Sequence, residues 1–253
     1  MNKELFFSTL RKCLFKKLSQ SQVDGINGIL EAFDQVGDSD KDTLAYALAT
    51  AYHETGARMV PVREGFAKTD EGARKAVSAL ARKRGPNSAV ARYARPAGPY
   101  GHVYYGRGHV QLTWLENYRG SSADAGVDLV KDPDAMLDPV ISARVLVKGL
   151  IDGRWSGKRK GLAYYEGVDD FLDQKEAEAA RQTVNGSDKA ALIAGYHKQF
   201  YDALTAADWQ PKPKNTVIKV KPTGKVGIGA AITAAIVSAG LYFIETIMKW
   251  IGF

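Results

Sequence analysis

The chain has 253 residues, of which 45% are hydrophobic and 25% charged, so it can bury one substantial core and carry an additional segment. Its single cysteine, Cys13, excludes an internal disulfide. The formal charge is +7, but residues 210–225 alone carry +5 and residues 1–209 only +2, which argues against a nucleic-acid-binding core.

The predicted elements are mainly helical. Leu5, Phe6, Leu10, Leu14 and Leu18 lie near one face of an amphipathic helix, for which packing against the body is favoured over membrane binding. A capped helix is predicted from 39 to 56, with Gly56 as its stop. Further helices are predicted over 70–83, 139–151, 170–183 and 188–205. Strand signals are few and short, so the fold class is mainly α.

The composition changes after Trp209. Residues 210–225 are rich in proline and lysine and form a basic linker, which separates the domain 1–209 from the segment 226–253. Nineteen residues, 226–244, carry no charge, which is close to the length of a membrane-crossing helix. We therefore predict a C-terminal hydrophobic helix that inserts into a membrane, although a buried or oligomerising helix has a similar composition.

Glu54 is the first candidate for chemistry. It lies in the last turn of the helix that Gly56 ends, where the negative end of the helix dipole and apolar neighbours such as Tyr52 and Met59 would raise its pKa. A raised pKa suits a general acid. A solvated glutamate is the simpler alternative, and a hydrogen-bonded core ring is the simpler interpretation of His53. No histidine spacing indicates a zinc site, so we expect no metal.

Glu64 is the candidate partner, ten residues further on and beyond Pro61. A loop of this length can place a second carboxylate across a cleft. An inverting glycosidase needs its two carboxylates roughly 6.5–9.5 Å apart with a water between them. From spacing alone, an ion pair between Arg63 and Glu64 is an equally good explanation.

A third feature is the segment from Tyr104 to Trp114, YYGRGHVQLTW, followed by Asn117 and Tyr118. Aromatic rings stack on sugar faces, and amides bond hydroxyl and acetamido groups, so this segment contains the materials of a sugar site. Tyr105 and Arg107 belong to the candidate set with them. A tight turn followed by a packed element is the alternative.

Together these strings resemble a known family. HETG, PVREG, YYGRGHVQLT and RQTVNG are similar, in that order, to family 19 glycoside hydrolases, and nearest to the phage endolysins among them; the similarity runs from about Gln22 to Leu204. The resemblance implies a two-lobed, lysozyme-like fold with a substrate cleft. It also implies cleavage of β-1,4 bonds next to N-acetylated sugars, with inversion.

By position in the family, Glu54 matches the general acid and Glu64 the second carboxylate, with Glu71 as the reserve candidate. Thr113 matches a residue that holds the attacking water, and Arg181 a basic residue near the carboxylates. The positions that match sugar-binding residues are Gln111, Asn117, Tyr118 and Asn185. His109 departs from the family pattern.

We therefore expect an endolysin that needs no cofactor and acts as a monomer on peptidoglycan glycan strands, with the bacterial membrane as a partner of its C-terminal helix. It would be made in the host cytoplasm and act on the cell wall. A chitinase and a membrane-active lysis protein are the alternatives. The lysines before the helix would keep the domain on the cytoplasmic side of the membrane, which is the wrong side for cleavage of the cell wall. The tail would therefore either perturb the membrane or bind anionic lipid from outside after lysis begins.

Overall fold

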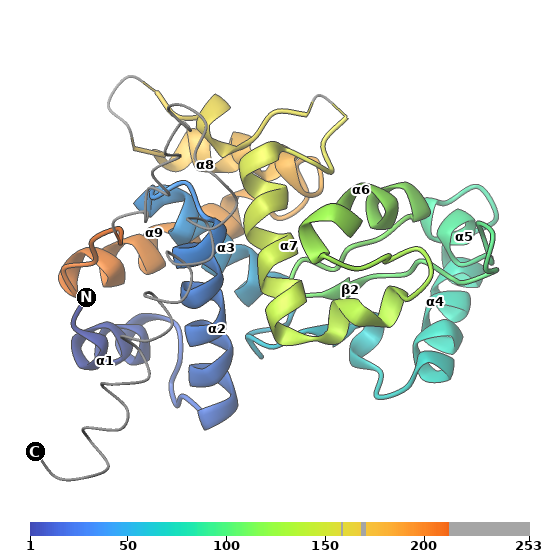
Figure 1. The fold of residues 1–253 in the computed structure, drawn as a ribbon, viewed down its shortest axis with the longest axis horizontal. Coiled ribbons are helices and arrows are strands. Elements are labelled where there is room, and N and C mark those ends of the chain that lie inside the picture. Colours follow the sequence, from blue (N-terminus) through green and yellow to red (C-terminus); the bar gives the residue numbers. More distant parts are fainter. Residues whose placement is uncertain (158, 168–170, 213–253) are drawn as a thin grey trace, which may run out of the picture. The chain divides into compact units, whose positions relative to one another are not determined.

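The computed structural model describes residues 1–157, 159–167 and 171–212 (Figure 1). One compact unit spans Met1–Lys212. The predicted membrane-inserting helix and the linker beyond Lys212 lie outside the described residues. Within the part that is described, no helix is long and apolar enough to cross a membrane.

Helices dominate the described residues, so the prediction of a mainly α fold is confirmed. The α-helices are α1 (Lys3–Cys13), α2 (Gln20–Val36), α3 (Lys41–Glu54), α4 (Asp70–Arg84), α5 (Ala89–Tyr93), α6 (Leu115–Ala125), α7 (Pro139–Asp152), α8 (Gln174–Ala180) and α9 (Ala190–Ala206). Short 3-10 turns cover Glu64–Phe66, Pro133–Leu137, Leu162–Tyr164 and Arg181–Thr183. Two short strands, β1 (Val62–Arg63) and β2 (Arg107–Gly108), pair in antiparallel fashion.

Four of the predicted helices are confirmed as α3, α4, α7 and α9. The helix predicted over 170–183 is shorter, because Asp173 forms a capping box with Glu176 and α8 therefore begins at Gln174. The first helix ends at Cys13, so Leu14 and Leu18 follow it rather than extend it. Helices α2, α5 and α6 were not predicted from the sequence.

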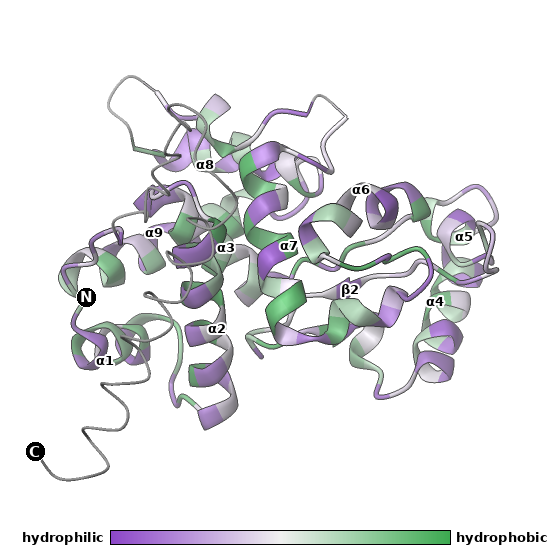
Figure 2. Cartoon of the chain, viewed as in Figure 1, coloured by the Kyte–Doolittle hydropathy of each residue, from purple (hydrophilic) through white to green (hydrophobic). Residues whose placement is uncertain are grey.

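Helix α3 lies at the centre of the larger of two hydrophobic cores. Its residues from Asp42 to Ala51 are all buried, and it packs against α2, α7 and α9. Helix α1 buries Phe6 and Leu10 and packs against α9, so the prediction that it packs against the body is confirmed. Green and purple residues share the same helices in Figure 2, as amphipathic packing requires.

A smaller core lies beneath α4 and α5. Its buried members are Ala73, Val77, Val90, Val103 and Tyr105. Two separate cores of unequal size correspond to the expected two lobes, and the segment that carries β2 contributes to both of them.

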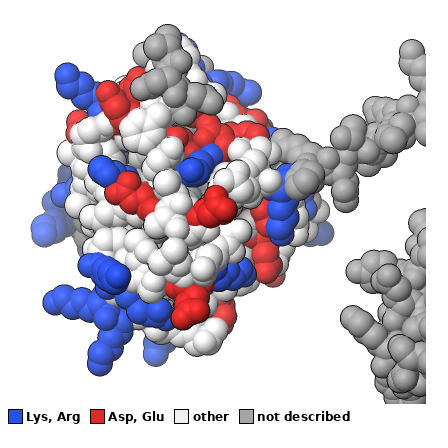
Figure 3. All heavy atoms as spheres, turned by 90° about the vertical axis from the view of Figure 1, so that its left-hand side faces the viewer, with Lys and Arg blue, Asp and Glu red and all other residues white. Residues whose placement is uncertain are grey.

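The face over α1 and α9, shown in Figure 3, carries both acidic and basic side chains.

Candidate active site

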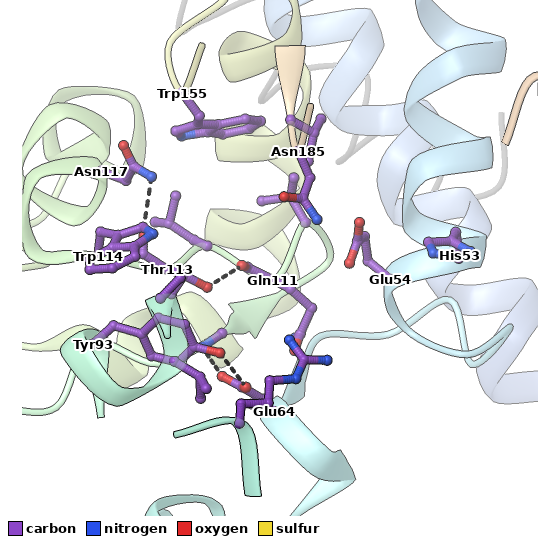
Figure 4. A pocket seen from close by; sticks show the side chains of 17 residues that line it. His53, Glu54, Glu64, Tyr93, Gln111, Thr113, Trp114, Asn117, Trp155 and Asn185 are labelled. Carbon is purple, nitrogen blue, oxygen red and sulfur yellow. Dashed lines mark hydrogen bonds between the residues drawn. The ribbon is translucent and has the colours of Figure 1, made fainter. Parts of the chain in front are cut away.

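A cleft of about 510 Å³ is lined by residues near both the larger and the smaller hydrophobic core (Figure 4). Six of the ten predicted site residues line it: Glu54, Glu64, Gln111, Thr113, Asn117 and Asn185. They come from the end of α3, the 3-10 turn after β1, the segment between β2 and α6, the first turn of α6, and the turn before α9. The tertiary fold therefore brings together residues that are up to 131 positions apart in the sequence.

Glu54 is the last residue of α3, and the backbone after it is tightly held. Gly56 has a φ of +57°, which glycine adopts without strain, and its N–H donates to the carbonyl oxygen of His53 at 3.1 Å. The N–H of Ala57 donates to the carbonyl oxygen of Tyr52 at 2.7 Å. These two bonds form a Schellman motif. The helix stop predicted at Gly56 is confirmed, and it presents Glu54 to the cleft.

The carboxylate of Glu54 is paired with Arg181. The guanidinium Nη2 lies 2.7 Å from Glu54 Oε1, and Arg181 Nε donates to the carbonyl oxygen of Asp188 at 3.1 Å. Arg181 is only 1% exposed. It therefore approaches Glu54 from the protein side instead of lining the cleft, which confirms the expected basic residue near a carboxylate but makes direct sugar contact unfavourable.

Both oxygens of Glu64 accept hydrogen bonds. Tyr93 Oη donates to Oε1 at 2.8 Å, and the N–H of Gly106 donates to Oε2 at 2.9 Å. A Cβ at position 106 would lie 2.8 Å from Gln111 Oε1, so a side chain here would push the amide of Gln111 aside. Burial, and then the neighbouring Glu64 carboxylate, raise the pKa of Tyr93, so its hydroxyl remains a neutral donor at neutral pH.

The expected alternative for Glu64, an ion pair with Arg63, is not what the structure shows. Arg63 instead pairs with Asp134 at 2.6 Å. The reserve candidate, Glu71, has a side chain that is 78% exposed and pairs with Lys75 on the surface of α4. Glu71 is not among the residues that line the cleft, whereas Glu64 is.

Thr113 and Gln111 have well-defined hydrogen-bonding roles. Thr113 Oγ1 donates to the carbonyl oxygen of Gln111 at 2.8 Å, so its hydroxyl oxygen keeps its lone pairs for a water molecule. Gln111 Nε2 donates to the carbonyl oxygens of Val62 and Gly108. The amide of Gln111 therefore joins its loop to β1 and offers mainly its acceptor oxygen to a ligand. Asn117 Nδ2 donates to the carbonyl oxygen of Thr113 at 2.8 Å.

Three predicted sugar-binding residues do not reach the cleft. Tyr105 and Tyr118 are fully buried, and Arg107 is only 2% exposed. Arg107 Nε donates to Asp134 at 2.8 Å, its Nη1 donates to the hydroxyl of Tyr118 at 3.0 Å, and its guanidinium lies 3.6 Å from the centroid of the Tyr105 ring. The aromatic and basic character of this segment thus serves a buried polar cluster that supports β2.

The residues that line the cleft but were not predicted as site residues include Arg84, Tyr93, Trp114 and Trp155. Trp114 could be recognised in the sequence, because it is an aromatic residue at the end of the candidate sugar-binding segment Tyr104 to Trp114. Tyr93, Arg84 and Trp155 stand in stretches without a motif, and only the fold brings them to the cleft. His53 also lines the cleft, and burial lowers its pKa.

Comparisons with known proteins find similarity to chitinases. Residues 24–149 match the family described as chitinase class I. An endochitinase of Persea americana is 28% identical over 194 residues, which are 68% of this chain and 56% of that protein. An endochitinase of Arabidopsis thaliana is 45% identical over 47 residues, or 17% of either chain. The chain thus spans little more than half of the first relative's length.

Among solved structures, chitinase C from Streptomyces griseus HUT6037 is similar, with a TM-score of 0.44 and 19% identity. The similarity covers 83% of this chain and 93% of that one.

Proposed function

We propose that the chain is a glycoside hydrolase that hydrolyses β-1,4 bonds of peptidoglycan glycan strands with inversion; the match of residues 24–149 to glycoside hydrolase family 19 (chitinase class I) supports this. The observation that carries the proposal is the presence of two glutamates with different surroundings in one cleft: Glu54 has an ion pair on one oxygen, and Glu64 has two hydrogen-bond donors.

Glu64 acts as the general base. A carboxylate that accepts a hydrogen bond on each oxygen has the pattern of the ionised form. In the reaction one proton of a water passes to Glu64, while Thr113 accepts a hydrogen bond from the other proton. The water oxygen forms the new bond to the anomeric carbon on the face opposite the leaving group, so the configuration inverts.

Glu54 acts as the general acid. Arg181 holds Oε1, and among the residues that the structure describes Oε2 has no hydrogen-bond partner, which leaves it for the glycosidic oxygen. Protonated Glu54 gives its proton to that oxygen as the bond to the anomeric carbon breaks. After one turnover Glu54 is ionised and Glu64 is protonated, and exchange with water restores both.

Substitution of Glu54 by Gln tests this assignment. Loss of a general acid should lower kcat on purified peptidoglycan roughly 10²- to 10⁴-fold with little change in KM, because the amide keeps the shape of the side chain but carries no acidic proton. Glu71→Gln, on the exposed surface of α4, is the matched control and should retain full activity. Substantial activity of Glu54→Gln would contradict the proposed role.

Chitin is the second candidate substrate, because the curated relatives are named endochitinases. Both polymers contain β-1,4-linked N-acetylglucosamine. The resemblance of the HETG, PVREG and YYGRGHVQLT strings to phage endolysins supports peptidoglycan. Mass spectrometry of the fragments released from each polymer distinguishes the two, and the sugar at the new reducing end identifies the bond that is cut.

We also retain the proposal that residues 226–253 associate with the bacterial membrane and that the enzyme is made in the host cytoplasm before it acts on the wall. A chain without residues 210–253 tests the first part. If the truncated and full chains partition equally between membrane and supernatant and lyse cells equally, the tail has no such role.

A further inference from the structure

The charge of the catalytic domain is distributed very unevenly. Residues 72–115 contain eight Lys or Arg residues and no Asp or Glu, whereas residues 1–71 and 116–209 together carry a formal charge of −6. Three of the eight cations, Arg74, Lys75 and Arg107, pair with carboxylates at Asp70, Glu71 and Asp134. The remaining five are Arg82, Lys83, Arg84, Arg92 and Arg95.

These five cations lie on or just after two helices that are in contact, and we call them the α4–α5 cationic face. Arg82, Lys83 and Arg84 occupy the last turn of α4; Arg92 lies in α5 and Arg95 just after it. The two helices pack against each other (Figure 1). All five side chains are exposed, and across the described parts of residues 1–212 none of them forms an ion pair.

The cationic face continues into the cleft. Arg84 lines the cleft together with Glu64 and Tyr93. The guanidinium of Arg92 lies 5.7 Å from the ring centroid of Trp114, which also lines the cleft. The helix dipole stabilises cations in the last turn of a helix. This effect explains neither the presence of Arg95, which lies outside α4, nor the position of Arg84 in the lining of the cleft.

We propose that the α4–α5 cationic face binds the carboxylates of peptide stems on the glycan strand that occupies the cleft. The proposal rests on the proposed function, since a strand of peptidoglycan carries carboxylates on its stems and a strand of chitin is neutral. Guanidinium groups bind carboxylates through paired hydrogen bonds. Because the face adjoins the cleft, a substituent of the bound strand itself can reach it.

The test measures binding to insoluble polymers in the full-length Glu54→Gln background, so that hydrolysis does not interfere. The variant R82Q/K83Q/R95Q removes three cations that do not line the cleft. It should bind purified peptidoglycan sacculi roughly tenfold more weakly at low salt, with less difference at high salt, and should bind chitin unchanged. Arg84→Gln alone should also weaken binding to sacculi.

The matched control is R11Q/K12Q/K16Q, which removes three exposed cations from the other lobe and should leave binding to sacculi unchanged. It separates a localised site from a general effect of net charge. Sacculi freed of phosphate polymers should give the same result, whereas sacculi whose carboxylates have been converted to neutral amides should bind the parent and R82Q/K83Q/R95Q equally.

Three results would overturn the inference: R82Q/K83Q/R95Q binds sacculi as its parent does, the control weakens binding equally, or blocking the carboxylates leaves the difference intact. The proposed function is measured separately, by the fragments that the wild-type enzyme releases. Cleavage of sacculi with normal binding by R82Q/K83Q/R95Q would refute this inference alone, while absence of fragments would refute peptidoglycan hydrolysis.

Discussion

His109 makes the stability of the protein depend on pH. Its ring is 1% exposed, and Nε2 lies 3.2 Å from the carbonyl oxygen of Met59, which can only accept a hydrogen bond. Ser142 Oγ accepts a hydrogen bond from the backbone N–H of His109 at 2.8 Å, and its hydroxyl can donate to Nδ1 of the His109 ring at 2.9 Å. This arrangement suits a neutral ring with its proton on Nε2. Burial lowers the pKa of His109 to about 4.

The size of the effect follows from that shift. Between pH 6.5 and pH 4 the unfolded chain binds a proton at His109 that the folded chain does not, so stability is full above pH 6.5 and falls as the pH decreases toward 4. A shift from about 6.5 to about 4 corresponds to roughly 3 kcal/mol of unfolding free energy.

Urea denaturation of the wild type and His109→Gln at several pH values between 7 and 4 measures this quantity. The wild type should lose roughly 3 kcal/mol more than the variant over this range, because the other titrating groups are common to both proteins. Equal losses in the two proteins would refute the reasoning. Equal m-values are required for the comparison, because a change in m would indicate a change in the unfolded or folded ensemble.

Two further substitutions test the cleft. Tyr93→Phe removes the hydroxyl that donates to Glu64 Oε1 and should lower kcat about tenfold with little change in KM. This is the effect expected when one hydrogen bond of about 1.5 kcal/mol to a charged group is lost. An unchanged kcat would show that this hydrogen bond does not position Glu64 for catalysis. Gly149→Ala places a Cβ 2.0 Å from the Trp155 ring, so it should displace that ring from the cleft, destabilise the fold by about 1–3 kcal/mol and raise KM for oligosaccharides. Gly120→Ala, where the Cβ meets nothing within 4 Å, is its control in both assays.

Signals that act over a few residues were readable from the sequence. The end of α3 depends on Gly56 and on bonds within five residues, so the position of Glu54 on the last helical turn could be predicted. The helices α3, α4 and α7 combine local caps with helical spacing and were predicted for the same reason, whereas α9 has no side-chain cap and was predicted without one. The short helix α5, with five residues, has too little periodicity to be recognised.

Burial and long-range pairing were decided only by the tertiary structure. Tyr105, Arg107 and Tyr118 have the residue types of a sugar site, and the sequence does not distinguish an exposed ring that stacks on a sugar from a buried one that stacks on an arginine. The same limit hid Tyr93, which is 29 residues from the carboxylate it contacts.

The sequence by itself determined the family resemblance, the mainly α class, and Glu54 and Glu64 as candidate carboxylates, because these depend on residue identity and short spacing. The tertiary structure decided what surrounds each carboxylate. Arg181 reaches Glu54 from 127 residues away, and Tyr93 and Gly106 reach Glu64 from other elements. The proposed division of roles between acid and base follows the family resemblance and draws on these contacts, and contacts between distant segments exist only once the chain has packed.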